Sequence, residues 1–366
     1  RQYEKALPHL EKSGDMYRKL SDRRGLAEVR NSVGSVYLQW GEYDQALELY
    51  ESALILAETS GMEPDIAAYR NNIGMVHYKL KNYIKAIENF NASVGIYEKL
   101  RKTATGDVRR DYFASQIGTY ESLVSTYLRN NDLSNAFSTI ELSRAKLLTE
   151  RLARTELDIS VPTLKEIQRN ISEDTAILTY ANVGHSKKIA IAITSDNIYG
   201  IELSDKEFMT SAREKYETPV NHTLKNLRGI KKVKKDRKEK KSNGKIDFND
   251  IINYYRNLLA DPFSEINNEY LFSKGNKSNL DQMLYDFLVK PLAEHIKHKE
   301  NLIIIPDGVL GLLPFETLKD SNGIYLIEKF NIMVKYIIRN QYCKWICYNH
   351  IFMYPRRLYR NWQHRF

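Results

Sequence analysis

The chain has 366 residues, of which 28% are charged and 42% hydrophobic, so it is long enough for two ordinary globular domains. No stretch approaches the run of about 18 apolar residues that a membrane-spanning helix needs, so the sequence predicts no membrane protein. Only Cys343 and Cys347 are present, which excludes a disulfide framework and predicts a reducing, cytoplasmic compartment. The chain opens on Arg1 without a charged-then-apolar leader, which leaves open a signal peptide removed from a precursor.

The net charge of +9 is concentrated in two segments. Residues 225–245 carry 11 Lys and Arg against two acidic residues, and residues 335–366 carry seven Lys and Arg and no acid. The rest of the chain is therefore net −7, so no basic face runs along the expected folded parts. The Lys-rich block is typical of a solvated insertion, the alternative being an electrostatic arm for nucleic acid or an acidic surface. Because the block lacks interleaved aromatic residues, nucleic-acid binding is not the expected function.

A pattern with a period of 40 residues organises the first part of the chain. Segment 29–54 aligns with segment 69–94, and one further step back places residues 3–13 opposite residues 43–53. A third unit, Leu123–Ser143, follows after a longer spacer. The following pairs of residues in the first two units fall in register: Arg30/Arg70, Asn31/Asn71, Gly34/Gly74, Val36/Val76, Tyr43/Tyr83, Ala46/Ala86 and Glu48/Glu88. Self-similarity at such a period predicts a solenoid.

Apolar residues at helical spacing predict two amphipathic helices in each unit, with Gly in the first and Ala in the second allowing close approach. This order of Gly, Tyr and Ala resembles the tetratricopeptide repeat (TPR) family over about residues 1–150. We expect about seven helices there, in antiparallel pairs, and a TPR domain over residues 1–158. Since the family's usual period is about 34 residues, longer helices or longer links between pairs are expected. Val124 stands where the other units have Gly.

The TPR resemblance implies a concave groove, lined by the first helix of each repeat, that binds a protein or peptide partner. The groove residues expected to contact an extended peptide are Asn31, Asn71, Leu38 and Tyr78, since a side-chain amide can both donate to and accept from a peptide backbone. The alternative for each Asn is a hydrogen bond to a neighbouring helix. His77 is interpreted as a packed helix residue. The sequence leaves the oligomeric state open.

The hydrophobic period changes after Pro162. Strands are expected at 175–180, 189–194, 197–202 and 302–306, and helices at about 206–217, 249–259 and 279–297. A helix around Ser143–Leu157 is expected to close the solenoid. Helices placed before a buried strand indicate an α/β domain. The sequence thus predicts a multidomain α + α/β protein.

The segment LIIIPDGVLGLLPFETL at 302–318 is the most specific local signal in this half. A buried strand ends at Pro306, and Asp307-Gly308 supplies a turn, so the residues themselves indicate a connection without chemistry. Following TPR-like repeats, this segment resembles the CHAT domain, a caspase-like domain associated with TPRs. The resemblance covers about residues 160–334, as a partial domain with the basic insertion 225–245.

The CHAT resemblance implies a cysteine peptidase in which a His, usually in a His-Gly pair, activates a Cys thiolate. Both positions would lie after the IIPDG segment, where no His-Gly pair occurs. The pairs His295/Cys343 and His298/Cys347 have a caspase-like separation, but both His precede the buried strand. No catalytic residue, metal site or cofactor is therefore predicted, and Cys343, Cys347 and His350 do not match a zinc pattern.

The last segment, residues 335–366, contains no Asp, Glu, Gly or Ala and shows no helical or strand period. We interpret it as out-of-frame sequence after a disrupted CHAT domain, the alternative being a genuine divergent C-terminus. The strand 302–305 and residues 325–332 would then expose edges and apolar side chains to water. The predicted function is a TPR interaction scaffold with an inactive, incomplete CHAT domain, and the alternative is a TPR-regulated cysteine endopeptidase.

Overall fold

The computed structural model describes residues 2–104, 106–151, 161–184, 186–215, 247–260 and 280–335. It divides into two compact units, Arg1–Val161 and Pro162–Phe366, which are described separately here. The expected boundary at residues 158–160, the basic insertion 225–245 and residues 336–366 of the tail lie outside the described residues.

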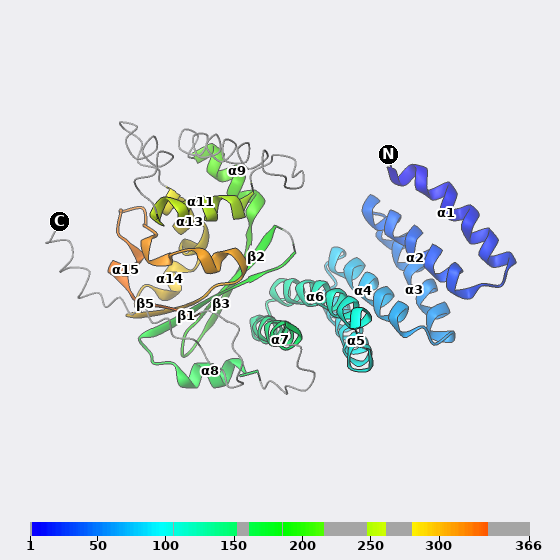
Figure 1. The fold of residues 1–366 in the computed structure, drawn as a ribbon, viewed down its shortest axis with the longest axis horizontal. Coiled ribbons are helices and arrows are strands. Elements are labelled where there is room, and N and C mark those ends of the chain that lie inside the picture. The colour runs from blue at the N-terminus through cyan, green and yellow to red at the C-terminus, as the bar shows by residue number, and fades with distance from the viewer. Residues whose placement is uncertain are drawn as a thin grey trace. The chain divides into compact units, whose positions relative to one another are not determined.

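The first unit is all-helical over its described residues, as the repeats predict (Figure 1). Consecutive helices pack against each other along the chain, from α1 against α2 to α6 against α7. The helices are α1 (Gln2–Lys19), α2 (Arg23–Trp40), α3 (Tyr43–Thr59), α4 (Glu63–Lys79), α5 (Tyr83–Thr103), α6 (Gly106–Arg129) and α7 (Leu133–Arg151). Seven helices were expected over 1–150, and α7 contains the first part of the predicted closing helix at 143–157, whose residues 152–157 are not described.

The 40-residue period arises from long helices, because α2, α3 and α4 have 17 or 18 residues and short turns join them. The third unit follows at a longer spacing because α5 has 21 residues and α6 has 24. Turn chemistry defines the helix ends. Asp22 caps α2 by accepting a hydrogen bond from the Gly25 main-chain N at 3.0 Å, and Gly41 ends α2 in the left-handed conformation at φ +84°.

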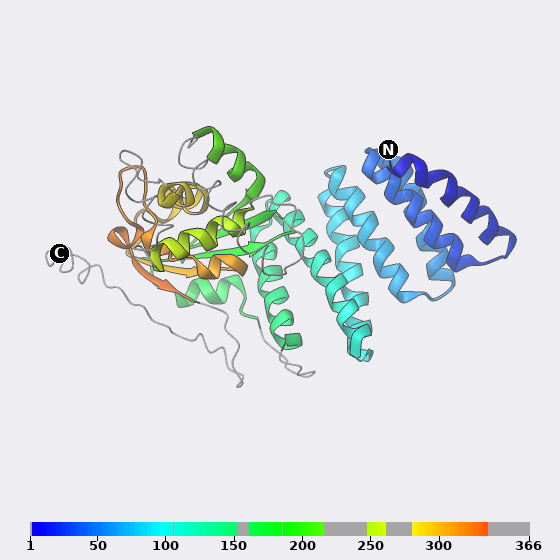
Figure 2. The same ribbon diagram turned by 45° about the horizontal axis from the view of Figure 1, so that its top comes forward.

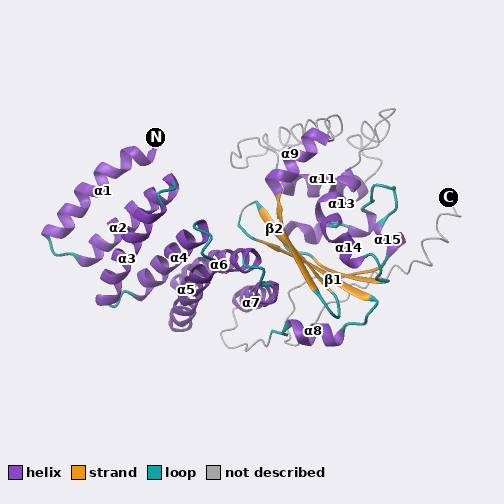
Figure 3. Ribbon diagram, turned by 180° about the vertical axis from the view of Figure 1, so that it is seen from behind, coloured by secondary structure: helices purple, strands orange, loops and turns teal. Residues whose placement is uncertain are grey.

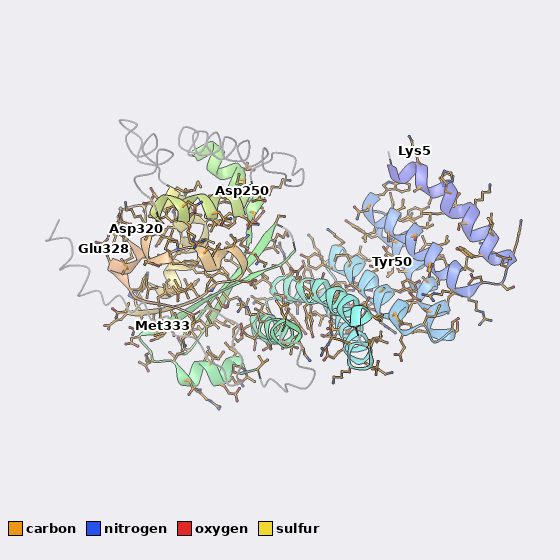
Figure 4. All side chains as sticks on the ribbon, viewed as in Figure 1. Lys5, Tyr50, Asp250, Asp320, Glu328 and Met333 are labelled. Carbon is orange, nitrogen blue, oxygen red and sulfur yellow. The ribbon has the colours of Figure 1, made fainter. Side chains whose placement is uncertain are left out.

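In the first two repeats, a glycine of the first helix packs against an aromatic residue of the second helix. A Cβ atom added to Gly34 would lie 2.9 Å from the Tyr50 ring, and one added to Gly74 would lie 2.8 Å from the Phe90 ring. Tyr50, labelled in Figure 4, and Phe90 are fully buried. Glycine is therefore required at both positions by close helix packing, because any side chain would collide with an aromatic ring.

The second unit has a five-stranded sheet, described over residues that leave gaps at 216–246 and 261–279. Its strands are β1 (Thr175–Asn182), β2 (Lys187–Ile193), β3 (Ile198–Ser204), β4 (Asn301–Ile305) and β5 (Asn331–Val334), in the order β3-β2-β1-β4-β5. β1, β2 and β3 pair antiparallel, whereas β4 is parallel to both β1 and β5. In register, Ile177 of β1 lies beside Ile303 of β4 and Ile193 of β2.

Helices cover both faces of this sheet (Figure 2). α8 lies on one face and α11 and α13 on the other. The helices and helical turns are α8 (Leu164–Asn170), α9 (Asp205–Lys215), α11 (Phe248–Ala260), α13 (Leu280–Leu288), η1 (Lys290–Leu292), α14 (Ala293–Ile296), η2 (Gly308–Leu312), η3 (Phe315–Thr317) and α15 (Leu326–Lys329). Alternate residues of β1, such as Leu178 and Tyr180, lie in the core that α11 and α13 share, and the residues between them are buried as well, so both faces of this strand are covered.

The four predicted strands and the helices at 206–217 and 249–259 are confirmed within two residues at each end. The single helix predicted at 279–297 is wrong, because α13 ends at Leu288 and η1 contains Pro291, which cannot donate the next helical hydrogen bond. The predicted exposed edge at 302–305 is also wrong, whereas β5, which contains the last two residues of the predicted range 325–332, is an edge strand of the sheet over the described residues. β4 is paired on both sides, Leu302 and Ile304 are buried, and residues 326–329 form α15 with Leu326 in the core.

Candidate functional site

The candidate face consists of first-helix positions that recur in the three units. These are Asn31, Ser35 and Leu38 of α2, Asn71, Met75 and Tyr78 of α4, and Glu121, Ser125 and Leu128 of α6. All nine residues are half-buried. The residues on either side of the middle residue of each unit are buried. Those before it are Gly34, Gly74 and Val124, and those after it are Val36, Val76 and Thr126. The face therefore has the same construction in all three units.

Asn31 contacts the neighbouring repeat. The Asn72 Nδ2 atom of α4 donates a hydrogen bond to the Asn31 Oδ1 atom at 2.7 Å. The main-chain oxygen of Asn31 also accepts from the Ser35 hydroxyl at 3.0 Å, and that hydroxyl lies 3.0 Å from the Tyr50 hydroxyl. The Oδ1 atom of Asn31 thus bonds a neighbouring helix, as the alternative interpretation of this residue proposed. This bond holds the amide in one position on the face.

Asn71 occupies the equivalent place one repeat later, but its environment differs. Its Oδ1 atom is buried and has no hydrogen-bond partner among the described residues. Ser122 of α6 stands where Asn72 stands in the repeat before, and its hydroxyl donates instead to the Gly118 oxygen of its own helix at 3.0 Å. The shorter side chain therefore does not reproduce the Asn31–Asn72 bridge. A buried acceptor without a hydrogen bond lowers the stability of the folded chain by about 1–3 kcal/mol.

Leu38 and Tyr78 supply the apolar part of the candidate face. Leu38 packs against the core that Ala46 and Tyr50 form in the first repeat. Tyr78 packs against the smaller core of Ala86 and Phe90, and its ring centroid lies 6.0 Å from that of Tyr83. The structure therefore anchors one edge of each side chain in the repeat while leaving each partly accessible.

His77, beside Tyr78, is buried and its Nδ1 atom has no hydrogen-bond partner among the described residues. Burial lowers the pKa of His77, and the positive charge of Lys85 lowers it further against the opposite effect of Glu51 and Glu88. The side chain is therefore a packed, neutral group, as interpreted from the sequence.

A partly buried polar cluster joins α5, α6 and α7, and the sequence analysis did not predict it. The Glu98 carboxylate accepts hydrogen bonds from Arg101 at 2.9 Å, Lys146 at 2.6 Å and Gln116 at 3.0 Å. Burial raises the pKa of Glu98, but these hydrogen bonds outweigh it and lower the pKa to about 2. Glu98 is thus a structural anion that ties three helices together. Arg101 lies three residues away on the same helix, but Gln116 and Lys146 lie 18 and 48 residues away, which no local pattern relates.

The PDG segment of the second unit is structural. The Asp307 carboxylate accepts hydrogen bonds from the main-chain N and the side-chain Nδ2 of Asn182, at 2.9 and 3.1 Å. Gly308 has φ +57°, and a Cβ atom there would lie 2.6 Å from Asn182 Nδ2. Phe315 and Leu318 are fully buried. The interpretation of these residues as a connection without chemistry agrees with these contacts.

The candidate peptidase and metal residues fall into two groups. Cys343, Cys347 and His350 lie outside the described residues. His295 lies on α14, where its ring stacks on Tyr199 of β3 at a centroid distance of 3.6 Å, and His298 follows that helix as an exposed residue. Over the described ranges no three His, Cys, Asp or Glu side chains gather as metal ligands, and no helix is long and apolar enough to cross a membrane.

Comparison with known families places two kinds of domain in the chain. Tetratricopeptide-repeat models match residues 1–59 and 67–100, and the CHAT-domain model matches residues 279–342. No curated protein matches the chain.

Solved structures of helical repeats are similar to part of the chain. Two crystal structures of nearly identical TPR-like repeats from a putative kinesin light chain of Podosopora anserina share 17% identity and a TM-score of 0.34. They cover 46% of this chain and 76% or 77% of their own chains. BtubC (BKLC) from P. vanneervenii shares 18% identity, covers 44% of this chain and 79% of its own, and has a TM-score of 0.24. The family matches, together with the helix pairs and the mixed sheet, identify the chain as carrying tetratricopeptide repeats at its N-terminus and part of a CHAT domain at residues 279–342.

Proposed function

We propose that the chain is an interaction protein whose repeats bind an extended segment of a partner protein on the candidate face, and that it is not a peptidase. The single observation that carries the proposal is the threefold recurrence of half-buried positions on α2, α4 and α6. TPR repeats are a class of binding domain, and stacked repeats expose one such face along the stack.

The chemistry of the face favours a main-chain ligand. Its polar positions on α2 and α4 are the amides and hydroxyl of Asn31, Asn71 and Ser35, and no Lys or Arg stands among the nine residues. Asn71 supports the proposal through the Nδ2 atom of its half-buried side chain, because an amide can donate to a peptide carbonyl, whereas its buried Oδ1 atom is closed to a ligand. Leu38 and Tyr78 would contact the apolar side chains of the same segment.

Selection of peptides from a random displayed library on the full chain tests this proposal. For a selected peptide, the double variant Asn31→Ala, Asn71→Ala should bind more weakly by about 1–3 kcal/mol, at about 0.5–1.5 kcal/mol for each neutral hydrogen bond. Asn89→Ala is the matched control, since the Asn89 amide donates to Lys85 of its own helix on α5. If the double variant binds the peptide like the control, the assignment of the contacts is wrong.

The CHAT match favours one second candidate, a cysteine endopeptidase regulated by the repeats. A panel of fluorogenic peptides, with and without a thiol-alkylating reagent, distinguishes the two functions. Turnover by the full chain that alkylation abolishes would establish the peptidase, whereas the interaction proposal predicts no thiol-dependent turnover.

A further inference from the structure

Two turns of the repeat stack lie on the same edge. The α2–α3 turn and the α4–α5 turn both follow a first helix, whereas the α1–α2 and α3–α4 turns lie on the opposite edge (Figure 3). α3 packs between α2 and α4, and the Asn31–Asn72 hydrogen bond joins these two first helices side by side. We call residues 39–45 the acidic turn and residues 79–85 the basic turn.

The two turns have the same backbone. Gly41 N and Glu42 N donate to the Leu38 and Tyr37 oxygens at 3.2 and 3.0 Å. In the basic turn, Lys81 N and Asn82 N donate to the Tyr78 and His77 oxygens at 3.1 and 2.8 Å. Gly41 and Lys81 both have positive φ, at +84° and +61°. Differences between the turns therefore reside in their side chains.

Those side chains carry opposite charge in the two turns, although the charged residues stand at different positions of each turn. The acidic turn presents Glu42 and Asp44, and the basic turn presents Lys79, Lys81 and Lys85. All five are exposed, and over the described residues none takes part in an ion pair. Lys81 adopts a left-handed conformation that favours glycine, so this lysine is present despite a backbone conformation that disfavours any residue with a side chain.

Large apolar side chains are exposed among these charges. Trp40 is 41% exposed beside the acidic turn, and Leu80 and Ile84 are 41% and 64% exposed in the basic turn. Apolar residues grouped within a charged rim have the composition of a protein contact rather than of an isolated surface. Each turn thus combines exposed charge of one sign with exposed apolar side chains, so the two turns together are complementary to a second copy of the same pair.

We propose that this edge is the contact surface of a two-fold symmetric homodimer. A two-fold axis between the turns places the acidic turn of one copy against the basic turn of the other, and the reverse contact forms at the same time. Trp40, Leu80 and Ile84 then meet near the axis and are withdrawn from water. The surface shares no residue with the candidate face, although Leu38 and Tyr78 of that face directly precede the two turns and the Tyr78 ring lies 6.0 Å from that of Tyr83.

Sedimentation equilibrium of the full chain at up to about 100 µM protein tests the dimer. Exposed ion pairs are weak and screened by salt, so we expect dimers at about 50 mM NaCl and a dissociation constant at least about tenfold larger at about 500 mM. Ile84→Ser should weaken the dimer at both salt concentrations. A wild-type chain that is monomeric throughout at low salt overturns the proposal.

A charge-swap pair makes the test specific to the two turns. The acidic variant carries Lys79→Glu and Lys85→Glu, and the basic variant carries Glu42→Lys and Asp44→Lys; both leave the left-handed Lys81 unchanged. Each variant alone should be monomeric, because like charges then face each other at both contacts. A one-to-one mixture should form a heterodimer, since both contacts become complementary again.

Two checks keep this result interpretable. Lys12→Glu with Lys19→Glu on α1 gives the same change in net charge as the acidic variant and should leave the wild-type dimer intact. Thermal unfolding by circular dichroism should show that all variants are folded. A mixture of the two charge-swap variants that remains monomeric while each is folded, or single variants that dimerise like wild type, overturns the proposal.

Discussion

Asp307 and Asn182 join the carboxyl ends of two parallel strands that are 125 positions apart in the chain. One carboxylate oxygen of Asp307 accepts both the main-chain and the side-chain N–H of Asn182, so the end of β4 is fixed beside the end of β1. The PDG turn is therefore part of the sheet's construction, and its stability can be measured directly.

Asp307→Ala should lower the free energy of unfolding of the second unit by about 1–3 kcal/mol, because it leaves two donors of Asn182 without their acceptor. Urea unfolding monitored by hydrogen exchange of the β1 and β4 amides measures the change. Glu207→Ala, which removes an exposed carboxylate of α9, is the control and should have little effect. Equal stability of the two variants would show that the Asp307–Asn182 contact contributes nothing.

Gly74→Ala should destabilise the repeats by about 1–3 kcal/mol, since the added methyl group would lie 2.8 Å from the Phe90 ring. Gly95→Ala on α5 is the matched control. A Cβ atom at Gly95 meets nothing within 4 Å, so this substitution should stabilise the helix by about 0.5–1 kcal/mol. Chemical denaturation followed by circular dichroism should therefore give effects of opposite sign.

The Glu98 cluster should make the first unit sensitive to acid. The pKa of Glu98 is about 2 in the folded chain, below its ordinary value of 4.5, so its contribution is fully present above about pH 4.5 and is lost as the pH falls towards 2. The contribution is on the order of 2–3 kcal/mol. Glu98→Gln should lower stability at pH 7 and flatten its fall between pH 4.5 and 2. Parallel pH profiles for the variant and the wild type would contradict this assignment.

Lys81→Gly should stabilise the repeats by up to about 1 kcal/mol, because Lys81 has φ +61° and glycine adopts that conformation without strain. Lys85→Gly, the same substitution inside α5, should instead destabilise by about 0.5–1 kcal/mol. Thermal unfolding of both variants at high salt, where charge effects are screened, isolates the backbone contribution. A loss of stability in both would show that the left-handed position carries no strain.

The spacing of apolar and small residues in the sequence was sufficient to predict the helix pairs of the first unit and four of the five strands of the second. The 40-residue pairing of Gly34 with Gly74 and of Ala46 with Ala86 predicted the helix pairs, because the same packing constraint recurs in each unit. Short apolar runs bounded by turn residues predicted β1 to β4, because buried strands are short and apolar and end at turns. Interruptions within a helix were harder to predict. The predicted helix 279–297 extended past Pro291 because the apolar spacing continues across that residue.

The contacts of single side chains could not be predicted. β5 follows α15 without a turn signal, and its pairing with β4 depends on residues 30 positions apart. Likewise, Asn31 and Asn71 occupy equivalent positions after an Arg, yet Asn72 bridges the first, whereas Ser122, at the position equivalent to Asn72, bonds its own helix and leaves the Asn71 Oδ1 atom without a partner among the described residues. This difference arises from the residue on the next helix, which a pattern within one repeat does not contain.

The change in helix length at α5 and α6 has a consequence for how the stack can vary. The first two units share their period, turn backbone and glycine–aromatic contact, so one further 40-residue copy there would repeat the same turn and the same glycine–aromatic contact. The third unit is different: α6 has 24 residues, and Glu98, Gln116 and Lys146 tie α5, α6 and α7 into one block. Insertion of a further repeat should therefore disturb fewer contacts on the N-terminal side of α5 than within the block of α5, α6 and α7, where it would break the hydrogen bonds of Glu98.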